Sequence, residues 1–278
     1  MNPITPLRFV ITGSSTGIGR ALVERLLSRG HYVWGLARSD QTHFAHGLNG
    51  QFRSSRCDVS LWVEVVSAAR EVQTDWAQLD GIITCAGIQG KVGRALAANP
   101  ADWSATVRAN LEGTYHALRA FAPLLEKATR RAKIVCFSGG GATQARPNFS
   151  AYGVAKTGIV RLVETIAAEE KNRLLDINAI APGSINTRLT DEIITLGPAS
   201  AGTEEYQAAL QLKKTDGTSL GQALNLVEWL LSPASDGISG KLLSAQWDPW
   251  ASLDRQVAML TKTDVYTLRR ILPEDRAK

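Results

Sequence analysis

The sequence predicts an α/β protein: a single doubly wound domain in which helices cover both faces of a seven-stranded parallel sheet. Two observations lead to this prediction. Short β-branched runs alternate with longer amphipathic stretches along most of the 278 residues, and a glycine-rich turn joins the first run to the first amphipathic stretch. There is no internal repeat and no low-complexity linker, so one domain accounts for the whole alternation.

Seven strands are predicted from their content of β-branched and aromatic residues. They are 9–12, 32–37, 52–57, 81–85, 133–137, 176–180 and 241–245. Because helical stretches separate them regularly, we expect parallel pairing through right-handed crossovers.

The helical stretches have apolar residues at helical spacing. In the first stretch, Leu22 and Leu26 share one face with their neighbours, and Gly30 follows as a C-cap. Segments 111–128 and 150–171 are predicted as two long helices, with apolar residues on more than one face. That distribution favours burial beyond a single subunit.

Two regions depart from this regular pattern. Residues 188–222 contain Gly197-Pro198 and Gly202 among short helical fragments, which favours a substrate lid over an ordinary surface excursion. We place the main domain at 1–247. Residues 248–278 are expected to form an extension that packs on the body or on a partner subunit.

Composition narrows the possible partners. The 31 basic and 26 acidic residues give a net charge of +5, but the basic residues are scattered, so we expect no nucleic-acid partner. No apolar run is long enough to span a membrane, and the start lacks the pattern of a secretory signal. The three cysteines lack metal-ligand spacing, so no metal is expected, and free thiols fit a cytoplasmic location.

The first predicted strand runs into the sequence TGSSTGIGR, whose glycines indicate a dinucleotide-binding turn of the Rossmann type. Gly13 permits a tight turn, Gly17 lets the backbone approach a pyrophosphate, and Gly19 lets the helix pack closely. The helix N-terminus offers free N–H groups to phosphates. The expected contacts of this turn are Gly13, Ser15, Thr16, Gly17, Ile18 and Gly19.

The end of the second strand indicates which nucleotide binds. An acidic residue there would favour NAD, but the chain has Ala37 and then Arg38. A guanidinium at this position suits a 2′-phosphate, so NADP(H) is preferred, with NAD(H) as the alternative. The nearby Asp40 and the absence of a second basic residue in the glycine turn argue for the alternative.

Tyr152 and Lys156 are four residues apart at the start of a predicted helix, so both project from one face. A lysine cation beside a phenol lowers the pKa of the phenol. Tyr152 could then exchange a proton with a carbonyl or alcohol near neutral pH.

Taken together, these motifs and several others along 1–247 resemble the short-chain dehydrogenase/reductase family. The others are Asp58-Val59 after the third strand, Cys85-Ala86-Gly87 after the fourth, Asn110 in a helix, and the loop PGSINT from Pro182 to Thr187.

The resemblance implies a role for each of these residues. Asp58 and Val59 would contact the adenine end of the cofactor. Cys85, Ala86 and Gly87 would lie over the cofactor, with Cys85 replacing the family's usual asparagine. Asn110 would hold a water in a proton relay to Lys156, which would also hold the nicotinamide ribose. The loop residues implied to bind the nicotinamide amide and a phosphate are Pro182, Gly183, Ile185 and Thr187.

The family's catalytic serine is missing at the expected spacing. Thirteen residues before Tyr152 the chain has Gly139, while Ser138 is one position earlier and on the other face of an extended strand. Three glycines at 139–141 could bend the strand enough to bring Ser138 in, or Thr143 could enter from the following loop. Alternatively, the substrate, water or backbone N–H groups orient the carbonyl.

The sequence therefore predicts an NADP(H)-dependent oxidoreductase that transfers a hydride between the nicotinamide and a carbonyl or secondary alcohol. The exposed backbone of the three glycines suggests a polyhydroxylated or sugar-like substrate. The alternative is a nucleotide-binding regulatory or structural protein with little activity, as Gly139 and Cys85 suggest. The resemblance also implies a homodimer or homotetramer assembled through 111–128 and 150–171.

Overall fold

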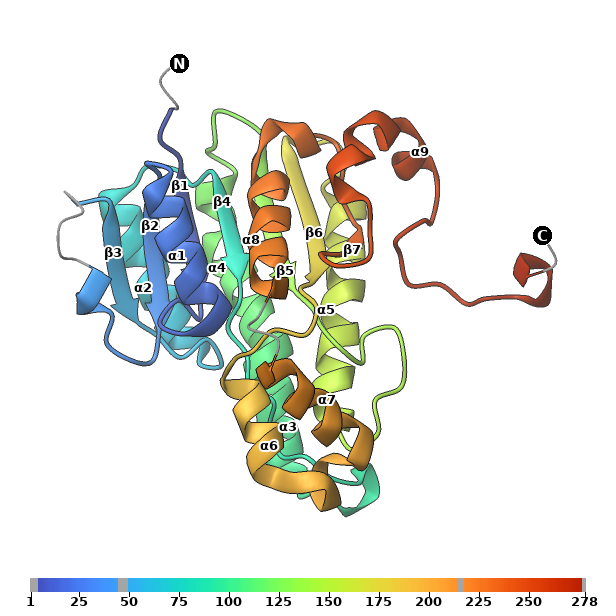
Figure 1. Ribbon diagram of the computed structural model, residues 1–278. Coiled ribbons are helices and arrows are strands. Elements are labelled where there is room, and N and C mark those ends of the chain that lie inside the picture. Colours follow the sequence, from blue (N-terminus) through green and yellow to red (C-terminus); the bar gives the residue numbers. More distant parts are fainter. Residues whose placement is uncertain (1–4, 45–49, 215–217, 277–278) are drawn as a thin grey trace.

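Seven parallel strands form one sheet in the order β3-β2-β1-β4-β5-β6-β7 in the computed structural model (Figure 1), which describes residues 5–44, 50–214 and 218–276. The strands are β1 Arg8–Thr12, β2 Tyr32–Ala37, β3 Phe52–Arg56, β4 Gly81–Thr84, β5 Ala132–Phe137, β6 Leu175–Ala181 and β7 Leu242–Ser244. The predicted α/β fold is thus confirmed, including the number of strands and their parallel pairing.

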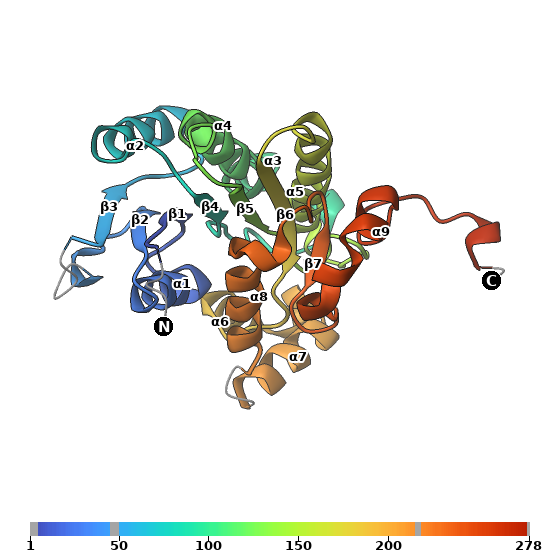
Figure 2. The same cartoon turned by 90° about the horizontal axis from the view of Figure 1, so that it is seen from above.

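Helices cover both faces of the sheet, as Figure 2 shows from above. One face carries α2 Trp62–Asp75, α3 Pro100–Val107, α4 Gly113–Leu125 and α5 Ser150–Glu169. The other carries α1 Gly17–Ser28 and α8 Thr218–Leu231. Each face has its own apolar core, because side chains of a central parallel strand alternate between two helical layers.

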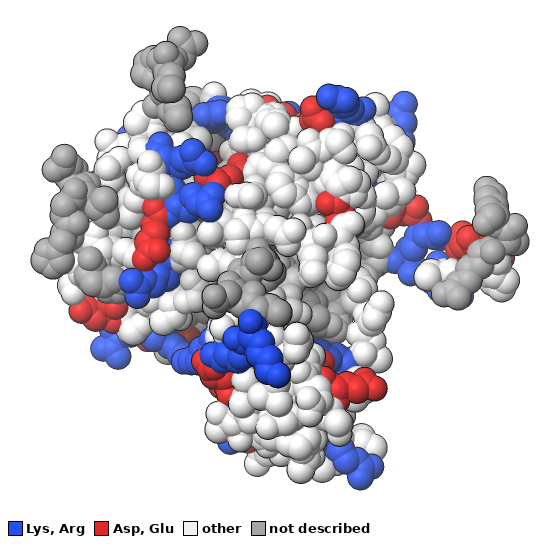
Figure 3. All heavy atoms as spheres, in the orientation of Figure 1, with Lys and Arg blue, Asp and Glu red and all other residues white. Residues whose placement is uncertain are grey.

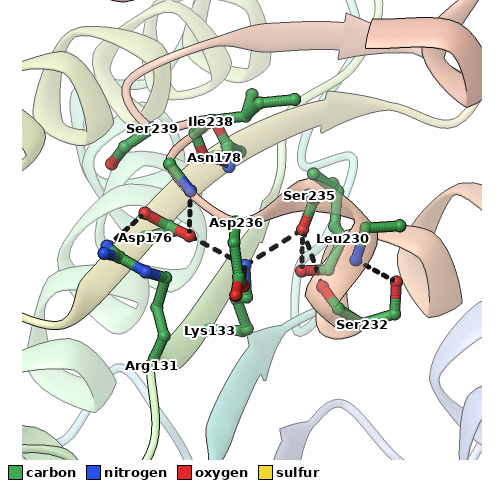
Figure 4. Close-up of polar contacts among 12 residues, drawn as sticks. Arg131, Lys133, Asp176, Asn178, Leu230, Ser232, Ser235, Asp236, Ile238 and Ser239 are labelled. Atoms are coloured by element: carbon green, nitrogen blue, oxygen red, sulfur yellow. Dashed lines mark hydrogen bonds and ion pairs between the residues drawn. The ribbon is translucent and has the colours of Figure 1, made fainter. Parts of the chain in front are cut away.

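A buried ionic network fixes the amino ends of β5 and β6 (Figure 4). Lys133 Nζ donates to Asp176 Oδ2 at 2.7 Å and pairs with Asp236 Oδ1 at 2.7 Å. Arg131 Nη1 donates to Asp176 Oδ1 at 3.1 Å, and the Gly237 N–H donates to Asp176 Oδ2. Charges buried this deeply are tolerated only when they are paired, so the network anchors the loop after α8 to the sheet.

Two helices, α6 Arg188–Ala201 and α7 Thr203–Lys214, lie beyond the carboxyl edge of the sheet (Figure 1). They contact one another extensively and project from the body, in the segment that the sequence predicts as a lid. The last residues of that predicted segment belong to α8, where Leu220 packs against the core on the α1 side.

The C-terminal segment crosses the β7 edge of the sheet. Leu253 and Leu260 are buried in the core on the α1 side. Farther on, Tyr266 accepts a backbone hydrogen bond from Leu242 in β7, and the Leu268 N–H donates to Glu164 of α5. The described end of the chain then projects away from the body (Figure 1).

Candidate active site

The glycine turn between β1 and α1 requires glycine at two of its positions. Gly13 has a φ of +69°, and a Cβ there would lie 2.7 Å from the Ala86 backbone. A Cβ on Gly19 would collide with the carbonyl of Gly13. Because β1, α1 and the end of β4 meet this closely, side chains at these positions would push the glycine turn away from the sheet.

The turn opens into a cleft of about 420 Å³ at the carboxyl edge of the sheet. The lining includes most of the residues predicted to bind the cofactor: Gly13, Ser15, Thr16, Gly17, Ile18, Gly19, Arg38, Asp58, Val59, Cys85, Ala86, Gly87 and Thr187. The N-terminus of α1 therefore faces a cavity suited to an anionic dinucleotide. Pro182, Gly183, Ile185, Tyr152 and Lys156 lie outside this lining.

Sequence reasoning missed several residues of the cleft. The additional lining residues are Leu36, Ala37, Ser39, Cys57, Ile88, Ala109, Arg188 and Leu189. Arg188 is the most informative of these, because it brings a second cation to the cleft from the first turn of α6. Its position directly after Thr187, at the start of a predicted lid helix, was the available clue.

The acidic residue near Arg38 is engaged elsewhere. Asp40 accepts hydrogen bonds from the Thr42 N–H at 3.0 Å and from the Thr42 hydroxyl at 2.7 Å, and it does not line the cleft. Ser39 donates to Ser15 at 2.8 Å, which ties the end of β2 to the glycine turn. Arg38, directly after β2, is thus the charged side chain that this end of the strand brings to the cleft lining.

At the end of β4, Thr12 braces the turn formed by Cys85-Ala86-Gly87. The Ala86 N–H donates to Thr12 Oγ1 at 3.1 Å, so a side chain of β1 supports this backbone. Burial raises the pKa of the Cys85 thiol to about 12. Cys85 is consequently a neutral thiol at physiological pH and an inert part of the wall.

Tyr152 and Lys156 both lie in the first two turns of α5, beside the end of β5. Lys156 Nζ lies 5.4 Å from the centre of the Tyr152 ring and donates to the Phe137 carbonyl at 2.9 Å. Burial lowers the pKa of Lys156 to about 8. Burial also raises the pKa of Tyr152, against the opposing effect of Arg146. The expected lowering of the phenol's pKa by Lys156 is therefore not what governs this structure, in which desolvation dominates.

Asn110 lies in a π turn, Arg108–Glu112, which joins α3 to α4. Its Nδ2 donates to the carbonyls of Ile88 and Thr106, each at 2.8 Å. Its Oδ1 is buried without a hydrogen-bond partner among the described residues. A Cβ on Gly87 would lie 2.5 Å from this oxygen and 3.6 Å from Lys156 Nζ, so the three residues meet behind the cleft.

The position of the missing serine faces the phenol. A Cβ built on Gly139 would lie 2.9 Å from Tyr152 Oη. Ser138 instead donates its hydroxyl to the Lys156 carbonyl at 3.0 Å and is buried, and Thr143 is exposed on the loop. The glycines do not turn Ser138 inward, because its backbone N–H still donates to Ile180 in β6 at 2.9 Å.

A small apolar cluster joins Tyr152 to the helices beyond the sheet edge. Phe149, Ile193, Ala201 and Ala209 are its buried members, with Val92, Tyr152 and Ile194 packed against them. The loop before α5 also reaches α7, where Arg146 forms a two-pronged ion pair with Glu205. The region next to the phenol is therefore mostly apolar, with one arginine.

Metal-ligand clusters, membrane-length helices and basic patches would each indicate another kind of function in the described residues. Within residues 5–44, 50–214 and 218–276, no three His, Cys, Asp or Glu side chains gather as a metal site. No helix in those ranges is long and apolar enough to cross a bilayer. Basic and acidic side chains are interspersed on the face shown in Figure 3, which therefore has no continuous basic stripe.

Residues 8–195, more than half of the chain, match the sequence profile described as short chain dehydrogenase. The chain belongs to the short-chain dehydrogenase/reductase family. It is an oxidoreductase of a family that binds NAD(P).

Similar proteins come from fungi and bacteria. The short chain dehydrogenase pigC of Monascus ruber is 27% identical, over 86% of this chain and 78% of that protein. The 3-oxoacyl-(acyl-carrier-protein) reductase of Haemophilus influenzae is 26% identical, over 82% of this chain and 90% of that protein. A structure of a Saccharomyces cerevisiae short chain dehydrogenase/reductase superimposes with a TM-score of 0.80 at 23% identity, covering 88% and 98% of the two chains. This last likeness establishes the fold alone.

Proposed function

We propose that this oxidoreductase is an NADPH-dependent carbonyl reductase with Tyr152 as its proton donor. The observation that carries the proposal is the meeting of Tyr152, Lys156 and Asn110 beside a cleft lined by the glycine turn. The cleft fits a dinucleotide, because the glycines leave its floor open and α1 directs its N-terminus toward it.

The preference for NADP(H) is supported by the charges around the cleft. Arg38 lines it from the end of β2 and Arg188 from the start of α6, while Asp40 binds Thr42 instead. A guanidinium recognises a phosphate group through charge-assisted hydrogen bonds. We infer that Arg38 contacts the 2′-phosphate, and that Asp58 and Val59 adjoin the adenine.

When bound, NADP(H) supplies the hydride. The protein's part is to orient the carbonyl and to deliver a proton to its oxygen. Because burial raises the pKa of Tyr152, the phenol keeps its proton at neutral pH, which is the form that carbonyl reduction consumes. Lys156 would hold the nicotinamide ribose. Asn110 Oδ1, buried and unpaired in the described structure, would accept from a water that relays the replacement proton.

No side chain takes the place of the family's serine in this proposal. Ser138 is bound to α5, Thr143 is exposed, and Gly139 offers only its backbone beside the phenol. Loss of one such hydrogen-bond donor typically costs about 3 kcal/mol of transition-state stabilisation. We therefore propose a working enzyme in which Tyr152 orients the substrate oxygen without a second hydroxyl.

The surroundings of Tyr152 support a substrate with an apolar body. Phe149, Ile193 and Val92 cluster at the phenol, under α6 and α7, which we propose as a lid. The exposed glycine backbone at 139–141 favours the alternative, a polyhydroxylated substrate. A panel of apolar ketones and sugar-like carbonyl compounds decides between them by comparison of kcat/KM.

The proposal is tested with Tyr152→Phe. This variant should bind NADPH with wild-type affinity and lose at least about 10²-fold in kcat, because the proton donor is gone. A measured Kd for NADPH below that for NADH, and loss of the difference in Arg38→Ala, would support the cofactor preference. Turnover that survives in Tyr152→Phe would mean that another group donates the proton. A biological activity that is unaffected by the change would favour the nucleotide-binding regulatory or structural protein that Gly139 and Cys85 suggest.

We also propose that the protein is a homodimer or homotetramer through α4 and α5. Tyr115 and Val154, on these two helices, are each about half exposed in the single chain. Apolar side chains exposed on neighbouring helices favour a protein partner over solvent. Light scattering gives the assembly directly.

A further inference from the structure

Arg146 is a charged side chain that an ion pair and aromatic contacts hold beside the proposed proton donor. It lies in the loop between β5 and α5, and its Nε and Nη2 donate to the two carboxylate oxygens of Glu205 at 2.6 and 2.7 Å. Glu205 belongs to the first turn of α7. A two-pronged pair of this kind fixes the plane of the guanidinium as well as its position.

Aromatic contacts hold the same guanidinium next to Tyr152. Its central carbon lies 3.9 Å from the centre of the Phe149 ring and 5.8 Å from that of the Tyr152 ring. Phe149 is fully buried in the apolar cluster of the lid. The guanidinium also lies beside Gly140, where a Cβ would be 3.7 Å from Arg146 Nη1, an ordinary contact distance.

The other groups that face Tyr152 make Arg146 the permanent cation of the site. Lys156, on the same helix, donates to the Phe137 carbonyl, and burial lowers its pKa to about 8. Cys85, directly after β4, is a partly buried thiol whose ionisation would disfavour the phenolate. Arginine keeps its charge throughout the physiological range, so its field on the phenol does not vary with pH.

We propose that Arg146 is a positioning residue for Tyr152, held by Glu205 of α7 so that its charge stabilises the phenolate in a site that lacks the serine hydroxyl. The inference rests on the proposed role of Tyr152 in proton transfer. It gives a function to the Arg146–Glu205 ion pair, which joins the loop before α5 to α7 and was not predicted from the sequence.

The test measures the ionisation of Tyr152 in two ways. One is the pH dependence of kcat/KM for alcohol oxidation, which requires the phenolate. The other is the ultraviolet absorbance of the phenolate, recorded while the protein is titrated without substrate or cofactor. For each variant, the same titration of a protein that also carries Tyr152→Phe is subtracted, so that the difference reports Tyr152 alone. The variants are Arg146→Met and Arg146→Gln, which are neutral, and Arg146→Lys, which keeps the charge.

Removing the cation should raise the pH at which the phenolate forms by about one unit in both measurements. Arg146→Lys should recover at least part of that shift. The matched control is Arg25→Met, because Arg25 forms a comparable half-buried pair with Glu228 between α1 and α8, away from Tyr152. It should leave both curves unchanged.

Two results would overturn the proposal. In the first, Arg146→Met and Arg146→Gln fold, lose activity, and titrate at the wild-type pH, which would make Arg146 purely structural. In the second, Arg25→Met shifts the curves equally. Failure of the proposed function is a separate result, since it would appear as undiminished turnover in Tyr152→Phe alone.

Discussion

At position 139 the chain has glycine instead of the family's serine, yet Tyr152 and Lys156 still lie beside one another. The phenol of Tyr152 lies so close to Gly139 that a Cβ would approach its oxygen to 2.9 Å. The Tyr152 phenol therefore lies against the backbone of Gly139, and any side chain introduced at position 139 requires the phenol to move.

This geometry separates two effects that Gly139→Ser would combine. Gly139→Ala displaces the phenol without adding a donor, whereas Gly139→Ser displaces it equally and adds a hydroxyl. We expect both variants to have lower kcat than the wild type, with the serine variant at least about tenfold faster than the alanine variant. Steady-state kinetics provide the comparison. Equal rates for the two variants would show that position 139 does not face the substrate oxygen.

Lys156 gives a prediction for stability. Burial lowers its pKa to about 8, whereas the lysine of an unfolded chain titrates near 10.5. Between these values the unfolded chain binds more protons, so the destabilising contribution of Lys156, about 3 kcal/mol at neutral pH, disappears as the pH rises through this range.

Lys156→Met removes the titrating group and serves as the reference. In urea unfolding at neutral pH and at about pH 10, we expect the stability advantage of the variant over the wild type to shrink at the higher pH. An advantage that stays constant with pH would mean that Lys156 titrates normally in the folded protein.

Among the elements, the junction of β5 and β6 depends on the Lys133–Asp176 pair. Both side chains are at least 95% buried, so Lys133→Met leaves the Asp176 carboxylate with only the partly exposed Arg131 as a cationic partner among the described residues. We expect a loss of about 3 kcal/mol in the free energy of unfolding, measured by chemical denaturation.

The control for this prediction is Arg131→Gln. Arg131 approaches the same carboxylate from the surface, so its loss should cost about 1 kcal/mol or less. Equal costs for the two variants would contradict the view that burial decides the strength of the network.

The elements were largely predictable from the sequence, and the exceptions have physical causes. The strands and the glycine turn follow from local composition, and all seven strands were predicted in place. The π turn at 108–112 was missed, since the sequence there has ordinary helical spacing. The Arg146–Glu205 pair joins residues far apart in sequence, so nothing local to either residue indicates it. The approach of position 139 to Tyr152, by contrast, was expected from the resemblance to the short-chain dehydrogenase/reductase family, which places a serine thirteen residues before the tyrosine.

At the level of the whole molecule, the C-terminal segment closes the β7 edge of the sheet. The Tyr266 carbonyl accepts a hydrogen bond from the Leu242 N–H. The carbonyls of Thr263 and Val265 accept hydrogen bonds from the buried Lys241 ammonium. An uncovered edge strand is prone to pair with another chain.

Deleting residues 263–278 should therefore lower stability by about 2 kcal/mol and promote self-association through β7. Thermal unfolding and light scattering measure the two effects. Deleting only 270–278 leaves these contacts in place and should behave as the full chain does. If both deletions give the same result, the edge is not what the segment protects.

The π turn at Asn110 has a consequence for how this chain tolerates change in length. A π turn holds one residue more than an α-helical turn, and the side chains of Asn110 and Thr114 bond to the carbonyls of Thr106 and Asn110 at this widened turn. Loss of one residue from 108–112 would let α3 and α4 merge into a single regular helix, and the merged helix would gain backbone hydrogen bonds. It would also swing Asn110 away from Gly87 and Lys156. The irregular turn at 108–112 therefore positions the Asn110 amide at the expense of helical regularity. Shortening it should raise the stability of the helix and lower the activity.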